Sequence, residues 1–408
     1  MAESKLERRL RASEPVAGVF APAGADFATP GILRWTAENG GELELADRSD
    51  PWPSDRDAEF TVHGQPYEGD VVTLFRCPVR RWTFRDTTTH VTSWMVALGE
   101  HTDGDERWPK ANFRPGTLHK WIPENGLSLL PDDDPARFVL EWRPPERRVV
   151  ALPGAELVLY PGAEWAWRYA PDWSIATTMT FGVTVDEPRT IDELAEHYGQ
   201  PLRAFCIFAA DEADDLLLES YYDPDSSRRV AVLRRDRRPS TREWRPDSGR
   251  FLFQAEHVSD IAATLAAWFD VWKRTHPSLG LFAETIEQGT TFSAPRFWTL
   301  YTAAENYWKS MRSGRRPWSV RALAERAAVD ETLTGATKDA LAVIGATRNY
   351  HAHLQVAGPA EPQLIGDQTY ESTRRLHVFQ ACVMRDLGMD TAMIEARLDD
   401  HYRTWPVP

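Results

Sequence analysis

The spacing of hydrophobic positions changes near residue 256 of the chain. From Val16 to Gln254, short stretches of β-branched and aromatic residues alternate with clusters of Pro, Gly and Asp, which is typical of strands joined by turns. Gly31–Trp35 and Glu42–Leu45 flank Asn39-Gly40-Gly41, residues that tolerate positive φ, and this pattern predicts a hairpin. Further strands are predicted at Val71–Phe75, Trp82–Arg85, Thr92–Leu98, Phe138–Trp142, Val149–Leu152, Glu156–Tyr160, Trp165–Tyr169, Ser174–Val185, Leu216–Tyr221, Arg229–Leu233 and Arg250–Gln254.

One helix is predicted inside this β-rich half. Thr190 and Glu193 have the spacing of a capping box, in which each residue satisfies a backbone N–H of the other. The run Gly199-Gln200-Pro201 is expected to end that helix.

After Glu256 the apolar positions recur with a period of about 3.6, which predicts helices. Ser259 is expected to cap the first, and Phe297, Leu300, Tyr301, Ala304 and Trp308 to form the core face of the second. The predicted helices are Ser259–Arg274, Pro295–Met311, Val320–Ala328, Thr334–His353, Gln368–Leu387 and Thr391–Tyr402.

Together these patterns predict an α+β protein of two domains. A chain of 408 residues is long enough for two hydrophobic cores. We expect a β-rich domain over residues 1–256 and an all-α bundle with short connections over residues 257–408.

Composition narrows the class of protein. Hydrophobic residues make up 42% and charged residues 26% of the chain, which is the balance of a globular protein. No apolar run is long enough to cross a bilayer, and Met1–Arg11 is charged without an apolar stretch, so we expect a soluble cytoplasmic protein with no membrane partner. Cys77, Cys206 and Cys382 are far apart, which indicates neither disulfides nor thiolate-bound zinc.

The net charge of −14 argues against a protein that coats nucleic acid nonspecifically, because phosphate binding depends on Lys and Arg. Any contact with RNA must be local. Two basic stretches could provide it, Arg228–Arg250 and Lys309–Arg321, although either could be ordinary solvated surface. In the second stretch the candidate RNA-binding residues are Lys309, Arg312, Arg315, Arg316 and Trp318, since aromatic rings beside Arg suit base stacking.

The segment Thr347–Leu354 concentrates cationic, amide and imidazole groups at one predicted helix end. A basic residue five positions before a His is expected about once by chance in this composition, so spacing alone carries little weight. The segment Arg348-Asn349-Tyr350-His351-Ala352-His353 resembles the R-x4-H signature of HEPN ribonucleases in the form with Asn after Arg.

The wider layout is similar to the Apea-like group of that family, whose β-rich N-terminal domain precedes a HEPN bundle. The aromatic helix around Tyr301 and Glu305 resembles the group's helix with an internal Glu, and Gly18–Phe20, Gly31–Leu33 and Gly41–Leu45 resemble the start of its β-rich domain. The resemblance implies an endoribonuclease of abortive-infection antiphage defence that needs no cofactor. It further implies cleavage of RNA, tRNA among the candidates, to 2',3'-cyclic phosphate and 5'-OH ends, and a phage-derived trigger acting on the N-terminal domain.

The residues are chemically suited to that reaction. The His353 imidazole, with an ordinary pKa near 6.5, can act as general base or acid. Arg348 can offset charge on the phosphate oxygens, and Asn349, four positions from His353 on one helix face, can orient the imidazole or contact phosphate. Arg348 and His353 point about 140° apart on an unbroken helix, so we expect a homodimer, or a higher homo-oligomer formed through the same domain, that places both pairs around one cleft. His351 is a candidate auxiliary group there.

Other interpretations stay open. Arg348 and His353 could simply be cations at a helix C-terminus. His351 and His353 could suggest a metal site, but residues two apart on a helix diverge by about 200°, so we expect no metal. Glu305 could be a surface residue or hold the Arg348 guanidinium. At the level of function, the alternatives are a catalytically silent module that binds RNA or a protein, and the toxin of a toxin–antitoxin pair.

Overall fold

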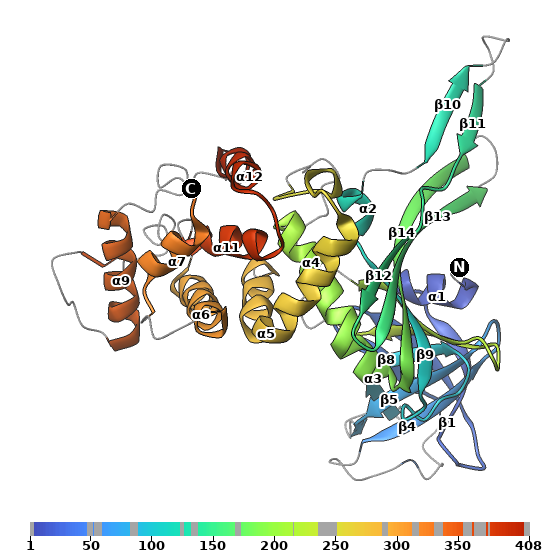
Figure 1. The fold of residues 1–408 in the computed structure, drawn as a ribbon. Helices are drawn as coiled ribbons and strands as arrows, with labels where there is room; N and C mark the ends of the chain where they lie inside the picture. The colour runs from blue at the N-terminus through green and yellow to red at the C-terminus, as the bar shows by residue number, and fades with distance from the viewer. Residues whose placement is uncertain are drawn as a thin grey trace. The chain divides into compact units, whose positions relative to one another are not determined.

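The computed structural model of the chain describes residues 4–46, 52, 59–81, 89–122, 126–131, 138–167, 173–214, 216–235, 251–287, 293–311, 318–329, 338–353, 361–362, 373 and 376–403. These residues form an α+β structure with a large antiparallel sheet and a set of helices, as expected (Figure 1). The chain divides into two compact units. The first contains residues 1–114, 153–199 and 216–241, and the second contains residues 115–152, 200–215 and 242–408.

Each unit therefore uses more than one stretch of sequence. Residues 115–152 and 200–215, which the sequence analysis placed in the first domain, belong to the second unit. The first unit begins with α1 (Lys5–Arg11), which buries Leu6 and Leu10. The remaining elements of the first unit are β1 (Val16–Pro22), β2 (Thr29–Thr36), β3 (Gly40–Leu45), β4 (Phe60–Pro66), β5 (Val71–Cys77), β6 (Val79–Arg81), β7 (Thr89–Ser93), β8 (Met95–Gly99), β9 (Trp108–Pro115), β13 (Ala155–Trp167), β14 (Trp173–Arg189), α3 (Ile191–Leu194), the π-helical turn η1 (Ala195–Gly199), β15 (Leu216–Asp223) and β16 (Arg228–Arg234).

The predicted hairpin is confirmed. Strands β2 and β3 pair antiparallel in register from Gly31 opposite Leu45 to Thr36 opposite Gly40. Gly40 has a φ of +78°, and the Asn39 N–H donates to the Thr36 hydroxyl at 3.0 Å. The turn residues therefore supply the backbone conformation that their sequence predicted.

The predicted strand Thr92–Leu98 is wrong as a single element, because it is divided into β7 and β8 at Trp94. The Ser93 hydroxyl lies 2.7 Å from the carbonyl oxygens of both Phe75 and Met95 and thus interrupts the ladder. In the sheet, β8 is connected to β7 through five other strands, in the order β8-β5-β4-β1-β2-β3-β7. Since one residue joins β7 to β8, the two ends of this series are adjacent and the sheet curls around its core.

The interior of the curled sheet is apolar. Alternate residues of β1 to β4 and of β7 are buried, as the period of two requires, while β5 and β8 are buried on both faces. Its fully buried members include Phe20, Leu33, Leu43, Val62, Val72, Leu74, Val91 and Val96. Strands β1 and β4 approach closely at Gly64, where an added Cβ would lie 2.5 Å from the Phe20 ring, so glycine is required there.

The predicted strand Glu156–Tyr160 and the described part, up to Trp167, of the predicted strand Trp165–Tyr169 belong to one strand, β13, which pairs with β14 from Ala155 to Trp167. The ladder continues through Pro161 and Gly162, opposite Met179 and Thr178. Strand β14 matches the prediction Ser174–Val185 and is longer, while the predicted strand Trp82–Arg85 lies outside the described residues.

The capping box is confirmed, but the predicted helix end at Gly199 is wrong. The Thr190 N–H donates to the Glu193 carboxylate at 2.9 Å and the Glu193 N–H to the Thr190 hydroxyl at 3.2 Å. After α3 the helical backbone continues through η1 into α4 (Gln200–Ala210). Pro201 follows directly after the π-helical turn, where the regular hydrogen-bond pattern of the helix is already interrupted, and Gly199 leaves room for the Phe113 ring.

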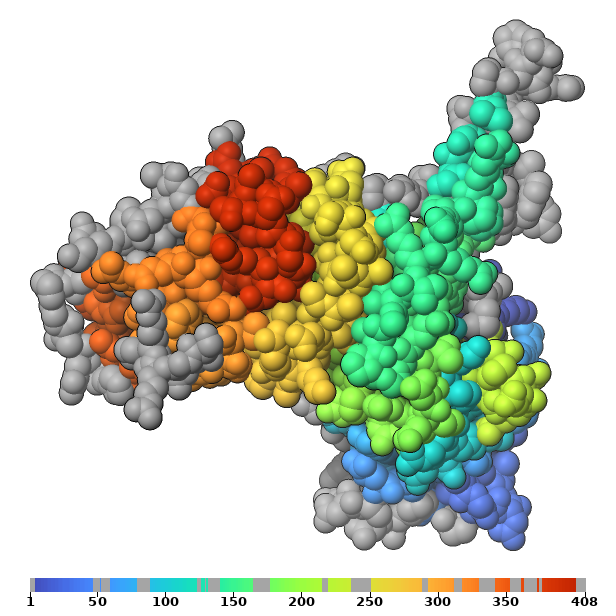
Figure 2. All heavy atoms as spheres, in the orientation of Figure 1, coloured from blue at the N-terminus to red at the C-terminus, as the bar shows by residue number. Residues whose placement is uncertain are grey.

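The second unit is mainly helical. It comprises α2 (Leu118–Trp121), β10 (Leu127–Pro131), β11 (Phe138–Trp142), β12 (Arg148–Leu152), α4, the 3-10 turn η2 (Ala255–His257), α5 (Ile261–Glu287), α6 (Ala294–Met311), α7 (Val320–Ala327), α9 (Lys338–His353), α11 (Val378–Asp386) and α12 (Thr391–Arg403). Strands β11 and β12 were predicted, and β10, which pairs with β11, was not. In the space-filling view α12 forms part of the visible surface of this unit (Figure 2).

The core of the second unit is aromatic. The Trp121 and Phe205 rings meet edge to face with centroids 4.8 Å apart, and Phe205 lies 5.4 Å from Trp268. The predicted strand Arg250–Gln254 is wrong for its described part: residues 251–254 form no strand, because Phe253 packs against Phe205 and donates its N–H to Ala209.

Helices α6, α7 and α12 agree with their predictions, as does the described part of the helix predicted from Thr334 to His353. Helix α11 (Val378–Asp386) covers only the later part of the helix predicted from Gln368 to Leu387, because a turn at His377 precedes it, and most of residues 368–375 lie outside the described residues. Helix α5 differs. Asp260, not Ser259, accepts the N–H of Ala263, and the helix passes Arg274 and Pro277 to reach Glu287. Pro277 removes one N–H, but Thr275, Ser278 and Leu279 are buried, so tertiary packing maintains the helix.

All three cysteines are free and buried. Among the described helices, none is both long and apolar enough to cross a membrane.

Candidate functional site

Helix α9 carries the Arg348–His353 segment. Its inner face buries Ile344, Ala346 and Thr347, and the Thr347 hydroxyl donates to the Val343 carbonyl at 2.8 Å. Both α6 and α7 contact α9 within the second unit (Figure 1). These contacts anchor one side of the helix, and residues 348–352 remain half-buried.

The Arg348 guanidinium lies over two aromatic rings of α6. Its central carbon is 5.6 Å from the centre of the Trp298 ring and 5.9 Å from that of the Tyr301 ring. One guanidinium nitrogen donates to the Asn349 amide oxygen at 3.2 Å. A cation placed over aromatic rings is attracted by their negative faces, so α6 orients the charged group of α9.

The two rings are themselves held in place. Trp298 and Tyr301 are three residues apart on α6, and their ring planes differ by 16° with centroids 6.5 Å apart. The Trp318 indole N–H donates to the Tyr301 hydroxyl at 2.9 Å, and the two rings meet edge to face. Burial raises the pKa of the Tyr301 phenol, an effect that Glu305 adds to and that Trp318 and Arg348 oppose.

His351 lies on the same side of α9 as Arg348. Three residues correspond to about 300° around a helix, so the two side chains leave the axis about 60° apart. The His351 ring centre is 6.2 Å from that of Phe297 on α6 and 5.5 Å from that of Tyr350. The structure therefore brings His351, the expected auxiliary group, to the aromatic helix beside Arg348.

His353 is the last residue of α9 in the structure, and its side chain lies outside the described part of the chain. Because α9 is unbroken from Lys338, the Cα atoms of Arg348 and His353 lie about 140° apart around its axis. The geometric reason for expecting a second subunit thus applies to the folded helix.

The remaining predicted residues have different outcomes. Glu305 forms an ion pair with Lys309 at 2.8 Å, one turn further along α6, and the Lys309 side chain is 52% exposed. The indole N–H of Trp318 is bonded to Tyr301, so this residue supports the aromatic pair. Arg312, Arg315 and Arg316 lie outside the described residues. Among the described residues, no group of three or more His, Cys, Asp or Glu side chains could hold a metal ion.

Trp298 was not among the site residues predicted from the sequence. It falls beside the predicted core face of this helix, next to the fully buried Phe297. A signal was present in the sequence, because a tryptophan outside the apolar stripe of an amphipathic helix has no core position to fill.

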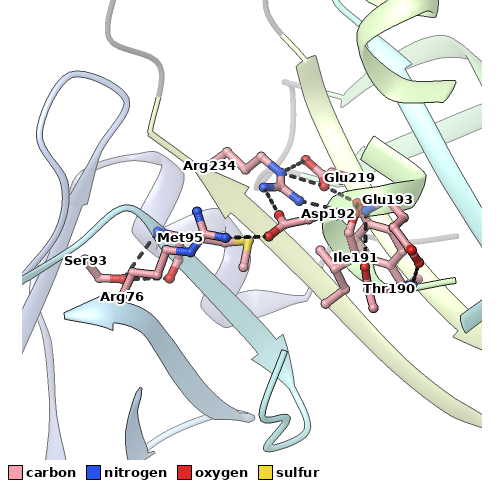
Figure 3. A network of polar contacts seen from close by, with 10 residues as sticks. Arg76, Ser93, Met95, Thr190, Ile191, Asp192, Glu193, Glu219 and Arg234 are labelled. Atoms are coloured by element: carbon pink, nitrogen blue, oxygen red, sulfur yellow. Dashed lines mark hydrogen bonds and ion pairs between the residues drawn. The ribbon is translucent and has the colours of Figure 1, made fainter. Parts of the chain in front are cut away.

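A second polar cluster lies in the first unit and involves Arg76, Asp192, Glu219 and Arg234 (Figure 3). Arg234 donates to both Glu219 oxygens at 2.8 and 2.9 Å and to Asp192 at 2.8 Å, and Arg76 donates to the other Asp192 oxygen at 2.9 Å. The Tyr221 hydroxyl also donates to Glu219. Each of the two carboxylates is paired with arginine, so this cluster ties α3 to β15 and β16 and is better suited to stability than to chemistry.

Comparisons of the chain with protein-family models, with curated proteins and with solved structures found no match. The residues of α6 and α9 and their geometry are therefore the basis for inferring a function.

Proposed function

We propose that the chain is a metal-independent endoribonuclease of the HEPN class, with a β-rich Apea-type N-terminal region and a helical ribonuclease region. The observation that carries the proposal is the placement of Arg348. Its guanidinium is oriented by the rings of Trp298 and Tyr301 and by the Asn349 amide, on the helix that also carries His351 and His353.

In the proposed reaction the ribose 2'-OH attacks the neighbouring phosphorus. As the P–O2' bond forms the 2'-OH gives up its proton, and as the P–O5' bond breaks the departing 5'-oxygen gains one; the His353 imidazole serves one of these two transfers and solvent the other. Arg348 stabilises the negative charge that grows on the phosphate oxygens. The products are a 2',3'-cyclic phosphate and a 5'-OH end, so no water molecule is consumed.

The cleft is proposed to lie at a two-fold interface between copies of α9. Such an interface would combine Arg348 and His353 from two chains, which a single helix keeps about 140° apart. In cells, the proposed role is abortive-infection defence in the cytoplasm, with host or phage RNA, tRNA among them, as substrate. The β-rich region is proposed to respond to a phage-derived trigger, since an unrestrained ribonuclease would damage its own host.

The test compares purified wild type with Arg348→Ala and His353→Ala on unstructured RNA and tRNA, with analysis of the product ends. Each variant is expected to lose cleavage by about 100-fold or more while keeping its thermal unfolding midpoint. Arg274→Ala, an exposed arginine on α5, is the control and should cleave like wild type. Unchanged cleavage in both site variants would remove the mechanism.

A binding module without catalysis is the second candidate. It is favoured by the contacts of Arg348 with two rings and an amide, which would also hold a guanidinium in a site that only binds RNA. Such a module would release no cleaved product even as wild type, whereas it would still bind RNA through Arg348.

A further inference from the structure

Trp298 is a large apolar side chain that the fold leaves partly in water. It is 37% exposed, although its neighbours Phe297 and Leu300 on α6 are fully buried. A tryptophan buries more apolar area than other side chains when it is covered, so leaving one exposed forgoes stabilisation. Exposure of this ring beside a cationic group suggests a binding role.

The surroundings of Trp298 make it a preformed platform. The Arg348 guanidinium lies against the ring, Tyr301 lies nearly parallel to it, and Trp318 fixes Tyr301 by a hydrogen bond and an edge contact. Little conformational freedom remains to be lost when a flat ligand binds.

The charges near the platform favour an anionic ligand. Arg348 supplies one cation at Trp298 itself. Lys309, eleven residues along the same helix, lies on the same side of α6, but its ammonium is paired with Glu305 at 2.8 Å, so Arg348 is the cation that the platform offers. A strand that stacks a base on Trp298 would place its neighbouring phosphate beside Arg348.

We propose that Trp298 stacks an unpaired base of RNA next to the phosphate that Arg348 contacts, so that the site takes single-stranded RNA. This inference rests on the proposed function and deepens it. Bases in a duplex already stack on both faces, whereas an unpaired base can leave its neighbours and stack on an aromatic side chain. With a net charge of −14, the chain gains little from nonspecific phosphate attraction, so stacking contributes a large share of the binding.

The first experiment measures the binding of a short 2'-O-methyl oligoribonucleotide, which cannot be cleaved, by fluorescence anisotropy. Trp298→Ala is expected to raise the Kd by about 5- to 150-fold, and Trp298→Phe, which keeps a ring, by less than about threefold. Trp94→Ala is the matched control in the first unit. Trp94 is 36% exposed with the Arg235 guanidinium 4.8 Å above its ring, and its loss should leave the Kd unchanged.

A second measurement leaves the protein intact. An oligonucleotide with abasic positions keeps its sugars and phosphates and lacks the bases at those positions. Wild type should therefore bind it as weakly as Trp298→Ala binds the complete strand. Trp298→Ala should bind the two strands alike, and a fully paired duplex should bind wild type and Trp298→Ala with the same weak affinity. This comparison remains valid even if one variant folds poorly.

The outcomes separate the inference from the proposed function. The stacking role would be overturned if wild type bound the complete and the abasic strand with the same Kd, and if Trp298→Ala bound the complete strand as tightly as wild type does. Loss of cleavage in Arg348→Ala would then still support the nuclease. Stacking that depends on Trp298, together with no cleavage of unmodified RNA by wild type, would overturn the nuclease and keep the binding site. No RNA binding by wild type would overturn this inference and favour a protein as the occupant of the platform.

Discussion

The guanidinium of Arg348 on α9 rests on the ring of Trp298 on α6, 5.6 Å from its centre. The two residues are fifty positions apart in the sequence, and only the packing of α6 against α9 brings them together. The contact fixes where one permanent positive charge lies and which way its flat face points. The same contact therefore also fixes the direction in which the N–H donors at the edge of the guanidinium point.

Arg348→Lys should therefore behave like a loss of the group, although it keeps the charge. A lysine ammonium has neither a flat face for the two rings nor a fork for two phosphate oxygens. We expect kcat/KM on a short RNA to fall by at least about tenfold relative to wild type. Arg274→Lys on the exposed face of α5 is the control. Full activity of Arg348→Lys would show that only charge matters at this position.

Mixing of two inactive chains tests the proposed two-fold cleft. If Arg348 of one subunit acts with His353 of the other, a mixed dimer of Arg348→Ala and His353→Ala contains one intact site. Random pairing should then restore about a quarter of wild-type activity, measured as initial cleavage rate at equal total protein. No recovery after subunit exchange, or a fully active monomer in sedimentation, would contradict the shared cleft.

We expect the free energy of unfolding to depend on pH because of two stacked histidines in the first unit. The rings of His63 and His101 are 4.3 Å apart and nearly parallel, and the His101 Nδ1 lies 3.5 Å from the Thr73 hydroxyl. Burial lowers the pKa of His63, and burial together with the neighbouring His63 lowers the pKa of His101. Both histidines are thus held neutral in the folded chain.

The direction in which the free energy of unfolding changes with pH follows from which state, folded or unfolded, binds protons first. Well above pH 6.5 the histidines are neutral in both the folded and the unfolded chain, so their contribution to stability is fully present; as the pH falls through about 6.5, the unfolded chain binds protons first and the contribution is lost. The free energy of unfolding should decline by up to about 1.4 kcal/mol per pH unit for each histidine. Denaturant unfolding at pH 5 to 7 measures this slope, which should be smaller for His63→Phe and unchanged for His197→Gln, an exposed position. Equal slopes in wild type and His63→Phe would contradict the assignment.

Glu219→Gln should destabilise the first unit. The Glu219 side chain is 3% exposed and accepts from Arg234 and Tyr221, so the variant keeps the shape and loses the charge that both donors face. We expect the free energy of unfolding to fall by about 3 kcal/mol, measured by denaturant titration. Glu68→Gln is the matched control, because the Glu68 pair with Lys5 is exposed and should matter little. Equal stability of both variants would mean that the buried cluster contributes no specific pairing.

Local patterns predicted much of the fold correctly. The β2–β3 hairpin, the capping box of Thr190 and Glu193, and the helix from Ala294 to Met311 each depend on residues within a few positions of one another. The same holds for the Arg348 segment, where residue types and spacing named the candidate groups before any contact was known.

What the sequence alone determined is therefore the α+β class, most of the helices and strands, and the chemical groups gathered at one helix end. The tertiary structure decided where elements begin and end when distant residues compete with local signals. Ser93 divides a strand, buried neighbours carry α5 through Pro277, and the ring of Phe113 packs against Gly199, where the helical backbone continues. It also decided that Trp298 meets Arg348. Periodicity and turn propensity depend on a residue and its near neighbours, whereas burial and pairing depend on which segments the whole chain brings together.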